Sequence, residues 1–201
     1  MPKPRKATET RKSSETVIKA DLTVDGKGTT KIKTPIGILS HMLELFCFHG
    51  FFDLVLDVKG DIHVDIHHTN EDIGIVLGKA FKDALKDKKG IKRFGSAFAP
   101  MEDTLGQTII DISGRGHFKC IINISSMADN EGYSLQSLEH FLDSFAKQLG
   151  ANIIIKVETT TSADLHTVME TVFKSFGMAL DVATQIDSRR KGIPSTKGII
   201  D

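Results

Sequence analysis

A histidine followed four residues later by a glutamate occurs twice in this chain, as His67 with Glu71 and as His166 with Glu170. Each pair starts an apolar pattern of helical period, and residues four apart share one face of a helix. Imidazole and carboxylate suit manganese, iron, nickel or zinc, and no cysteine accompanies them to form a structural thiolate site. The sequence therefore predicts one metal-ligand helix that is present twice.

The distribution of the histidines supports a metal site over coincidence. A lone histidine on a helix is more often an ordinary surface or core residue than a ligand. Five of the eight histidines, however, lie in or at the start of predicted helices: His41, His67, His68, His140 and His166. In the first copy His68 adds a second imidazole beside His67, whereas the second copy has Thr167 at that place.

Three further segments put cationic or hydroxyl side chains beside glycine: Lys92–Gly95, Ser113–Gly116 and Pro194–Gly198. Arginine forms forked hydrogen bonds to phosphate, and serine, threonine and lysine add donors. Together the three segments are suited to holding a phosphate group. Each alone also has the composition of an ordinary solvated loop, so both interpretations stay open for each segment.

Periodicity and turn residues indicate the elements that position these groups. In the first half we predict a hairpin of Thr16–Val24 and Thr29–Lys33, a helix at Ser40–Phe48, a second hairpin of Leu54–Lys59 and Asp61–Ile66, and a ligand helix at Thr69–Lys86. In the second half we predict a turn-rich connector over Gly90–Phe98 and Pro100–Thr104, strands at Thr108–Ser113 and Phe118–Ile124, a helix at Leu135–Leu149, a strand at Asn152–Glu158 and a ligand helix at Leu165–Ala183. The second half thus repeats the order of the first. This repetition predicts an α+β fold made of a duplicated half-domain, with the helices packed between two sheets.

Composition limits the classes of function and the location. The 201 residues include 26 Lys and Arg against 26 Asp and Glu, so no net charge attracts nucleic acid or an anionic membrane. The basic segment Met1–Lys12 lacks the apolar core of a signal peptide, and no stretch is apolar for long enough to span a membrane. Only Cys47 and Cys120 are present, too few for a disulfide framework. We therefore expect a cytoplasmic protein, with no nucleic-acid or membrane partner.

Several motifs, in this order along the chain, resemble those of the imidazoleglycerol-phosphate dehydratase family: His67–Asp72, Arg93–Gly95, Pro100–Asp103, Asp111–Arg115 and Pro194–Gly198. The resemblance extends from Ser14–Thr16 to the C-terminus. It implies a manganese-dependent lyase of histidine biosynthesis, which dehydrates imidazole glycerol phosphate to imidazole acetol phosphate. It also implies half-domains that each contain a four-stranded sheet with helices on one face, and trimers that assemble into a homo-oligomeric 24-mer with active sites at subunit interfaces.

The resemblance also implies a division of the chain. Residues 1–14 would be a basic N-terminal tail, residues 15–92 and 93–185 the two half-repeats, and residues 186–201 a C-terminal substrate-binding loop. All four segments would belong to one compact catalytic domain.

Residue by residue, the resemblance implies two manganese ions per subunit. The first would be bound by three imidazoles and a carboxylate: His41, His68, His166 and Glu170. The second would be bound by His67, Glu71 and His140, with Thr167 at the expected position of a fourth protein ligand. Substrate contacts would come from Glu15, Arg93, Arg115, Lys174, Ser195 and Lys197, with the basic residues and Ser195 chiefly around the phosphate. Of the candidate catalytic carboxylates Glu15, Glu71 and Glu170, we favour Glu15 as acid/base, because its match in the family is not a metal ligand.

The chain departs from the family pattern close to the expected metals. Ser40 and Ile66 stand where the family has aspartate, and Pro35 stands where it has glycine. Carboxylates that orient metal-bound imidazoles are worth about 10–100-fold in affinity or activity. Together with Thr167, these departures leave two hypotheses. The chain is an active dehydratase with an altered second metal site, or it is a catalytically weakened or inactive relative that keeps the oligomeric shell and binds metal or ligand.

Overall fold

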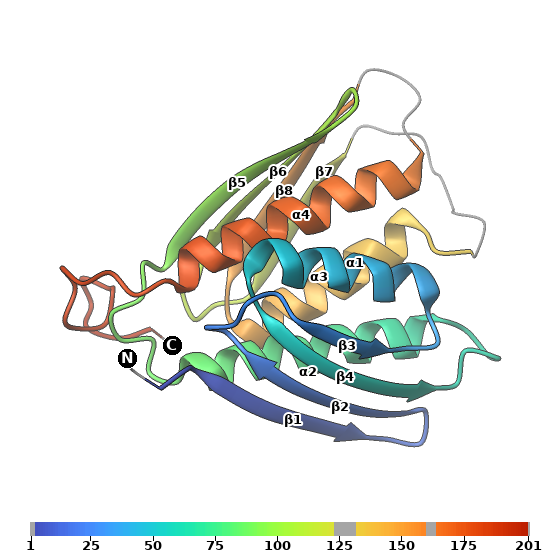
Figure 1. The fold of residues 1–201 in the computed structure, drawn as a ribbon, viewed down its shortest axis with the longest axis horizontal. Helices are drawn as coiled ribbons and strands as arrows, with labels where there is room; N and C mark the ends of the chain where they lie inside the picture. Colours follow the sequence, from blue (N-terminus) through green and yellow to red (C-terminus); the bar gives the residue numbers. More distant parts are fainter. Residues whose placement is uncertain (1–2, 123–131, 160–163, 201) are drawn as a thin grey trace.

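The computed structural model of the protein describes residues 3–122, 132–159 and 164–200. In these ranges four helices lie between two four-stranded sheets (Figure 1). The first half of the chain contains β1 (Lys6–Lys12), β2 (Thr16–Thr23), β3 (Thr30–Lys33), α1 (Gly37–Gly50), β4 (Asp53–Gly60) and α2 (His67–Leu85). The second half contains β5 (Phe94–Met101), β6 (Thr104–Asp111), β7 (His117–Ile122), α3 (Leu135–Leu149), β8 (Asn152–Glu158) and α4 (Leu165–Thr184).

The two sheets have the same topology, which confirms the predicted duplication. Their strand orders are β1-β2-β4-β3 and β5-β6-β8-β7. In each sheet the first two pairs are antiparallel and the last pair, β3 with β4 or β7 with β8, is parallel. A parallel pair needs a crossover, and α1 and α3 provide it. The predicted α+β fold, with helices between two sheets, is therefore confirmed.

The core is centred on an aromatic cluster to which each helix contributes one residue: Phe46, Phe81, Phe145 and Phe176. The Phe46 ring lies 4.8 Å from that of Phe176 and 5.9 Å from that of Phe81, between centroids. The Phe145 ring lies 5.1 Å from that of Phe176. Such pairs add about 0.5–1.5 kcal/mol each to the free energy gained by burial. The cluster therefore links the helices of the two halves into one core.

The helices pack in two close pairs, α1 against α4 and α2 against α3. Glycines allow the backbones to approach. A Cβ atom on Gly177 of α4 would overlap the carbonyl oxygen of Phe46 in α1. Cβ atoms on Gly74 and Gly78 of α2 would lie 2.5 Å from the carbonyl oxygens of Phe141 and Phe145 in α3. Side chains on adjacent turns of each pair are thereby brought into contact across the two halves.

The expectation that residues 1–14 form a tail is wrong for Lys6–Lys12, which is strand β1. It pairs with β2 over its whole length, from Lys6 opposite Thr23 to Lys12 opposite Val17. The sequence KATETRK has one apolar residue, so its pattern does not resemble that of a half-buried strand. An edge strand tolerates this composition, because backbone pairing with one neighbour holds it, alternate side chains are exposed, and Arg11 on the other face pairs with Asp72 of α2 at 2.7 Å.

Thr16–Val24 and Thr29–Lys33 do not form the predicted hairpin. β3 pairs in parallel with β4 instead, and β2 lies on the other side of β4. The carboxylate of Asp53 accepts hydrogen bonds from the backbone N–H groups of Lys27 and Thr29, each at 2.9 Å. These bonds hold the connecting loop against the start of β4 and carry the chain across to its far side.

Two further predictions of local structure are wrong. Asp61–Ile66 is a turn and not a strand, and Asp65 accepts a 2.8 Å hydrogen bond from the N–H of His67 at the start of α2. The expected connector contains strand β5, whose partner β6 is joined by a tight turn in which Glu102 has a φ of 52°. The remaining predicted helices and strands are confirmed to within a few residues, except that the end of Phe118–Ile124 lies outside the described residues. Among the helices of the described ranges, none is long and apolar enough to cross a membrane.

The Gly177→Ala substitution should destabilise the protein, because its methyl group has no room against Phe46. Overpacking of this kind costs about 1–3 kcal/mol in the free energy of unfolding. Gly192→Ala is the control, because a Cβ atom there meets no atom within 4 Å. Urea denaturation measures both variants. Equal stability of the two would contradict the close approach of α1 and α4.

Candidate active site

Each of the four helices begins at the same end of the helical layer (Figure 1). The predicted metal-ligating histidines lie in the first two turns of these helices, at His41 in α1, His67 and His68 in α2, His140 in α3 and His166 in α4. The duplicated topology therefore places every predicted imidazole ligand at one end of the molecule. Each cluster then combines one helix from each half, α1 with α4 in one and α2 with α3 in the other.

His41, His166 and Glu170 form a compact group, with one ligand atom from each residue within 4.8 Å of the others. Glu170 Oε1 lies 3.1 Å from His166 Nε2 and 3.6 Å from His41 Nε2. The two imidazoles stack with their centroids 5.5 Å apart. Two imidazoles and a carboxylate suit a divalent metal such as manganese, iron, nickel or zinc. The donor set of this group, called the triad below, therefore fits the metal that the sequence predicts.

Lys174, one turn beyond Glu170 on α4, holds the other carboxylate oxygen of the triad. Its Nζ lies 2.5 Å from Glu170 Oε2. Burial raises the pKa of Glu170, but the hydrogen bond and charge of Lys174, with the two histidines, outweigh burial and keep the pKa below its ordinary value. The carboxylate is thus ionised and oriented for a cation. Within one chain Lys174 therefore lies with the triad and not with the other predicted phosphate-binding residues.

The second predicted ligand group is less convergent. His67 Nε2 lies 3.4 Å from Glu71 Oε2, whereas His67 Nδ1 lies 3.1 Å from Nδ1 of His140. The two contacts use opposite nitrogens of the His67 ring, so the three donors do not point at one position. Thr167, at the expected fourth position, donates its backbone N–H to the capping carboxylate of Asp164 at 2.7 Å. The donor types fit a metal here, but their arrangement in one chain does not.

His68 lies apart from the triad and beside two carboxylates. Its Nδ1 is 3.2 Å from Asp61 Oδ2 and 3.9 Å from Glu15 Oε1. The hydrogen bond to Asp61, followed by the charges of Glu15 and Asp61, raises the pKa of His68. The structure therefore brings Glu15, the predicted acid/base, next to a predicted metal ligand. It does not bring His68 to the triad within one chain.

A buried polar network ties α2 to α3 one turn from His67 and His140. The Asn70 side chain is fully buried; its Nδ2 donates to the carbonyl of Ser137 at 2.7 Å, and its Oδ1 accepts from the Tyr133 hydroxyl at 2.8 Å. Asn70 is three residues beyond His67, and Ser137 is three residues before His140. The network therefore fixes how the two imidazoles face each other. A hollow of about 310 Å³ opens beside them.

Tyr133→Phe should destabilise the protein, because it leaves the buried Asn70 oxygen without its donor. A loss of this kind costs about 1–3 kcal/mol in the free energy of unfolding. The double variant Asn70→Leu, Tyr133→Phe serves as the control. It removes both polar partners, so its loss should be smaller than the sum of the single losses. Urea denaturation of Tyr133→Phe, Asn70→Leu and the double variant checks this, and a Tyr133→Phe protein as stable as the wild type would contradict it.

A cationic pocket of about 150 Å³ brings together four of the predicted substrate-binding residues: Arg93, Arg115, Ser195 and Lys197. The Arg93 guanidinium is held by Asp111 through two bonds of 2.6 and 3.1 Å, and it donates to the Pro194 carbonyl at 2.9 Å. Arg93 thus attaches the C-terminal segment to the second sheet. Arginine, lysine and serine donors that converge in this way suit a phosphate group.

The cationic pocket and the triad lie at opposite ends of α4. The N–H of Arg93 donates to the carbonyl of Ala183 in the last turn, at 2.9 Å, whereas His166 is in the first turn. A helix of 20 residues is roughly 30 Å long at the usual rise per residue. A small phosphorylated molecule therefore cannot contact both groups of a single chain.

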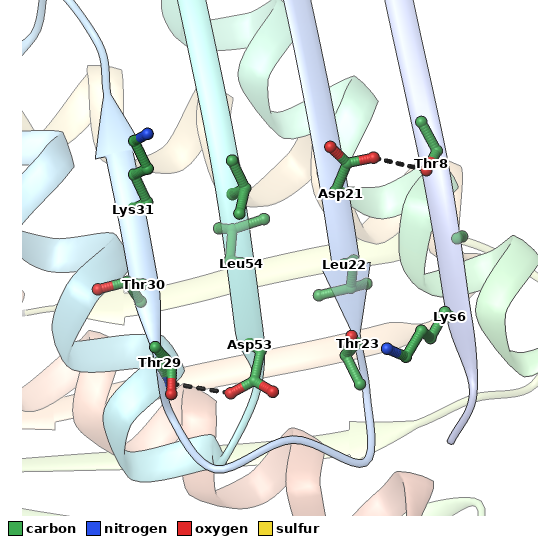
Figure 2. A pocket seen from close by; sticks show the side chains of 12 residues that line it. Lys6, Thr8, Asp21, Leu22, Thr23, Thr29, Thr30, Lys31, Asp53 and Leu54 are labelled. Atoms are coloured by element: carbon green, nitrogen blue, oxygen red, sulfur yellow. Dashed lines mark hydrogen bonds between the residues drawn. The ribbon is translucent and has the colours of Figure 1, made fainter. Parts of the chain in front are cut away.

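A larger hollow of about 500 Å³ lies on the outer face of the first sheet (Figure 2). Its walls carry Lys6, Asp21, Lys31 and Asp53 from all four strands. The hydroxyl of Thr8 donates to Asp21 at 2.6 Å, and Asp53 holds the β3 loop. None of the predicted ligand or substrate residues lines it, so the hollow is separate from the candidate active site.

Comparison with known proteins identifies the family. The family model for imidazoleglycerol-phosphate dehydratase matches residues 34–180. The chain belongs to the imidazoleglycerol-phosphate dehydratase family. It is 46% identical over 196 residues to the imidazoleglycerol-phosphate dehydratase of Bacillus pumilus, covering 98% of this chain and 100% of that protein. It is 47% identical over 197 residues to that of a Thermoanaerobacter species, with the same coverage.

Solved structures of this family have the same fold. The imidazoleglycerol-phosphate dehydratase structure from Pyrococcus furiosus, in complex with (S)-C348, superposes with a TM-score of 0.79 at 34% identity, covering 94% of this chain and 99% of that one. The structure from Staphylococcus aureus has a TM-score of 0.77 at 29% identity, covering 90% and 100%. The predicted family and its duplicated α+β fold are therefore confirmed, and with them membership in a family of lyases of histidine biosynthesis.

Sequence reasoning missed three residues of the candidate active site. Asp61 lies in a segment predicted as a strand, so its contact with His68 was not expected. Asn70 and Tyr133 are 63 residues apart, and their hydrogen bond follows from the packing of α2 on α3. A buried asparagine at an otherwise apolar helix position was the available signal for this bond, because such a side chain needs a partner.

Proposed function

We propose that this chain catalyses the manganese-dependent dehydration of imidazole glycerol phosphate to imidazole acetol phosphate. The triad and the cationic pocket in one chain of this family are the observation that carries the proposal. The pocket offers donors for the phosphate, and the triad offers ligands for a metal that binds the imidazole end. The pocket and the triad thus match the phosphate end and the imidazole end of one substrate.

The chemistry explains why the substrate needs such a site. No carbonyl acidifies the carbon-bound proton that must be removed, so an enolate route is closed. Bound manganese would supply Lewis acidity to the imidazole ring nitrogens. Arg115, Ser195 and Lys197 would hold the phosphate, and Arg93 would fix the C-terminal segment that carries two of them. Glu15 would move the proton, since its carboxylate lies 3.9 Å from His68 Nδ1 and is half exposed.

We further propose that the working site is shared between copies of the chain, in a 24-mer built from trimers. The length of α4 supports this, because the pocket and the triad of one chain are too far apart for one substrate. The separation of His68 from the triad supports it as well. Exposed apolar side chains on the outer face of the second sheet, Phe98, Ile109, Ile121 and Ile154, are suited to burial in such an assembly.

The alternative is a weakened or inactive relative that keeps the assembly and binds metal or ligand. Thr167 favours it, because a threonine hydroxyl is a poor ligand for a metal of this class, and the contacts of His67 diverge. The complete triad and cationic pocket favour the active enzyme. We propose the cytoplasm as the location, in keeping with a biosynthetic enzyme whose two cysteines are unpaired.

The purified wild-type protein should convert imidazole glycerol phosphate when supplied with manganese, and lose turnover on chelation. Product formation and elemental analysis measure turnover and metal content. Thr167→His should raise the manganese content and the turnover, because it supplies an imidazole at the second site. One metal per subunit with no turnover would instead favour the binding-only relative.

Glu15→Gln should lower kcat by about 100-fold or more, because a general acid/base contributes typically 10²–10⁴-fold. Steady-state kinetics and manganese titration are the measurements. Manganese content should change little, since Glu15 is not a proposed ligand. Glu44→Gln on α1 is a control for loss of one exposed carboxylate. Full turnover by Glu15→Gln with normal metal content would exclude the acid/base role.

A further inference from the structure

Asp61 lies in the turn between β4 and α2 and faces His68. Its Oδ2 is 3.2 Å from His68 Nδ1. Its Oδ1 is buried and has no hydrogen-bond partner among the residues for which the structure is described. The side chain is 17% exposed, against 47% for Glu15, the other carboxylate near the same nitrogen. Asp61 is therefore the nearer and more constrained of the two partners of His68.

The geometry points to Asp61 as the positioning residue that orients His68 for metal binding. This inference rests on the proposed function. A neutral imidazole carries its proton on one ring nitrogen, and a carboxylate at Nδ1 places the proton there. The lone pair is then on Nε2, the nitrogen on the opposite side of the ring from Asp61. Asp61 thus determines both the tautomer of His68 and the direction in which its free nitrogen points.

The same contact keeps Glu15 available for proton transfer. Both carboxylates approach His68 Nδ1, which has one proton to donate. Asp61 accepts it at 3.2 Å, so Glu15 at 3.9 Å is not required for orienting the ring. Loss of the Asp61 charge would leave Glu15 as the nearest anionic partner of His68. The two carboxylates therefore have different roles: Asp61 orients the ring, and Glu15 remains free to transfer the proton.

Close packing after β4 holds Asp61 in place. A Cβ atom on Gly60 would overlap the hydroxyl of Thr69, the residue that follows His68 on α2. The end of β4 therefore lies against the first turn of α2, and the next residue, Asp61, reaches the His68 ring. Ile66 cannot take this role, because its apolar side chain packs against the hydrophobic core.

Asp61→Asn tests the inference with little change in size. In metal-free protein labelled with ¹⁵N-histidine, His68 should lose the predominance of the Nδ1–H tautomer in its ring-nitrogen shifts. Manganese affinity, followed by the electron paramagnetic resonance of free Mn²⁺, should fall by about 10–100-fold. Asp57→Asn removes an exposed carboxylate of β4 and should change neither quantity. Asp61→Glu, which keeps the charge, should recover part of the affinity.

Urea denaturation of Asp61→Asn checks that it is folded before these measurements are compared. If it unfolds, Asp61→Glu and the tautomer of His68 in the wild-type protein decide the question. An Nε2–H tautomer in the wild type, or wild-type manganese affinity in folded Asp61→Asn, would overturn the inference. Both readouts are independent of turnover. Failure of the wild type to dehydrate its substrate would therefore count against the proposed function and not against the role of Asp61.

Discussion

The close approach of helix backbones at glycine is the constraint on which the candidate site depends. Gly177 lets α4 lie directly on α1, and Gly74 and Gly78 let α2 lie on α3. Because ligand side chains are short, imidazoles from different helices come within reach of a shared carboxylate only if the backbones are this close. The aromatic cluster then fixes the two helix pairs relative to each other. The stability of the core and the geometry of the triad therefore have the same origin.

Three of the candidate functional side chains are held by an oppositely charged or polar partner. Lys174 holds Glu170, Asp61 holds His68, and Asp111 holds Arg93. These pairs are partly buried, and each fixes the direction in which the side chain that it holds points. A ligand or phosphate-binding group that is already oriented loses less conformational entropy on binding. Such pairs therefore orient the metal-ligand candidates and the phosphate-binding candidates independently of each other.

The fold also places the triad and the cationic pocket at opposite ends of one chain. Duplication places the helix starts of both halves at one end, which concentrates the histidines there (Figure 1). The C-terminal segment folds back over the other end, where Arg93 fixes it to the second sheet. Since α4 separates the two ends, the proposed chemistry requires neighbouring copies. In the proposed function Thr167 would affect only the second ligand group, because neither the triad nor the cationic pocket includes it.

The sequence by itself determined the duplicated α+β fold, the bounds of α3 and β8, and the two pairs of histidine and glutamate that lie four residues apart. These follow from periodicity and spacing, which depend on neighbours along the chain. Only the tertiary structure decided that KATETRK is a strand, that β3 joins β4 in parallel and that β5 replaces a connector. It alone placed Asp61 beside His68, Tyr133 beside Asn70 and Lys174 beside Glu170. Edge pairing and contacts between helices depend on residues distant in sequence, so no local pattern records them.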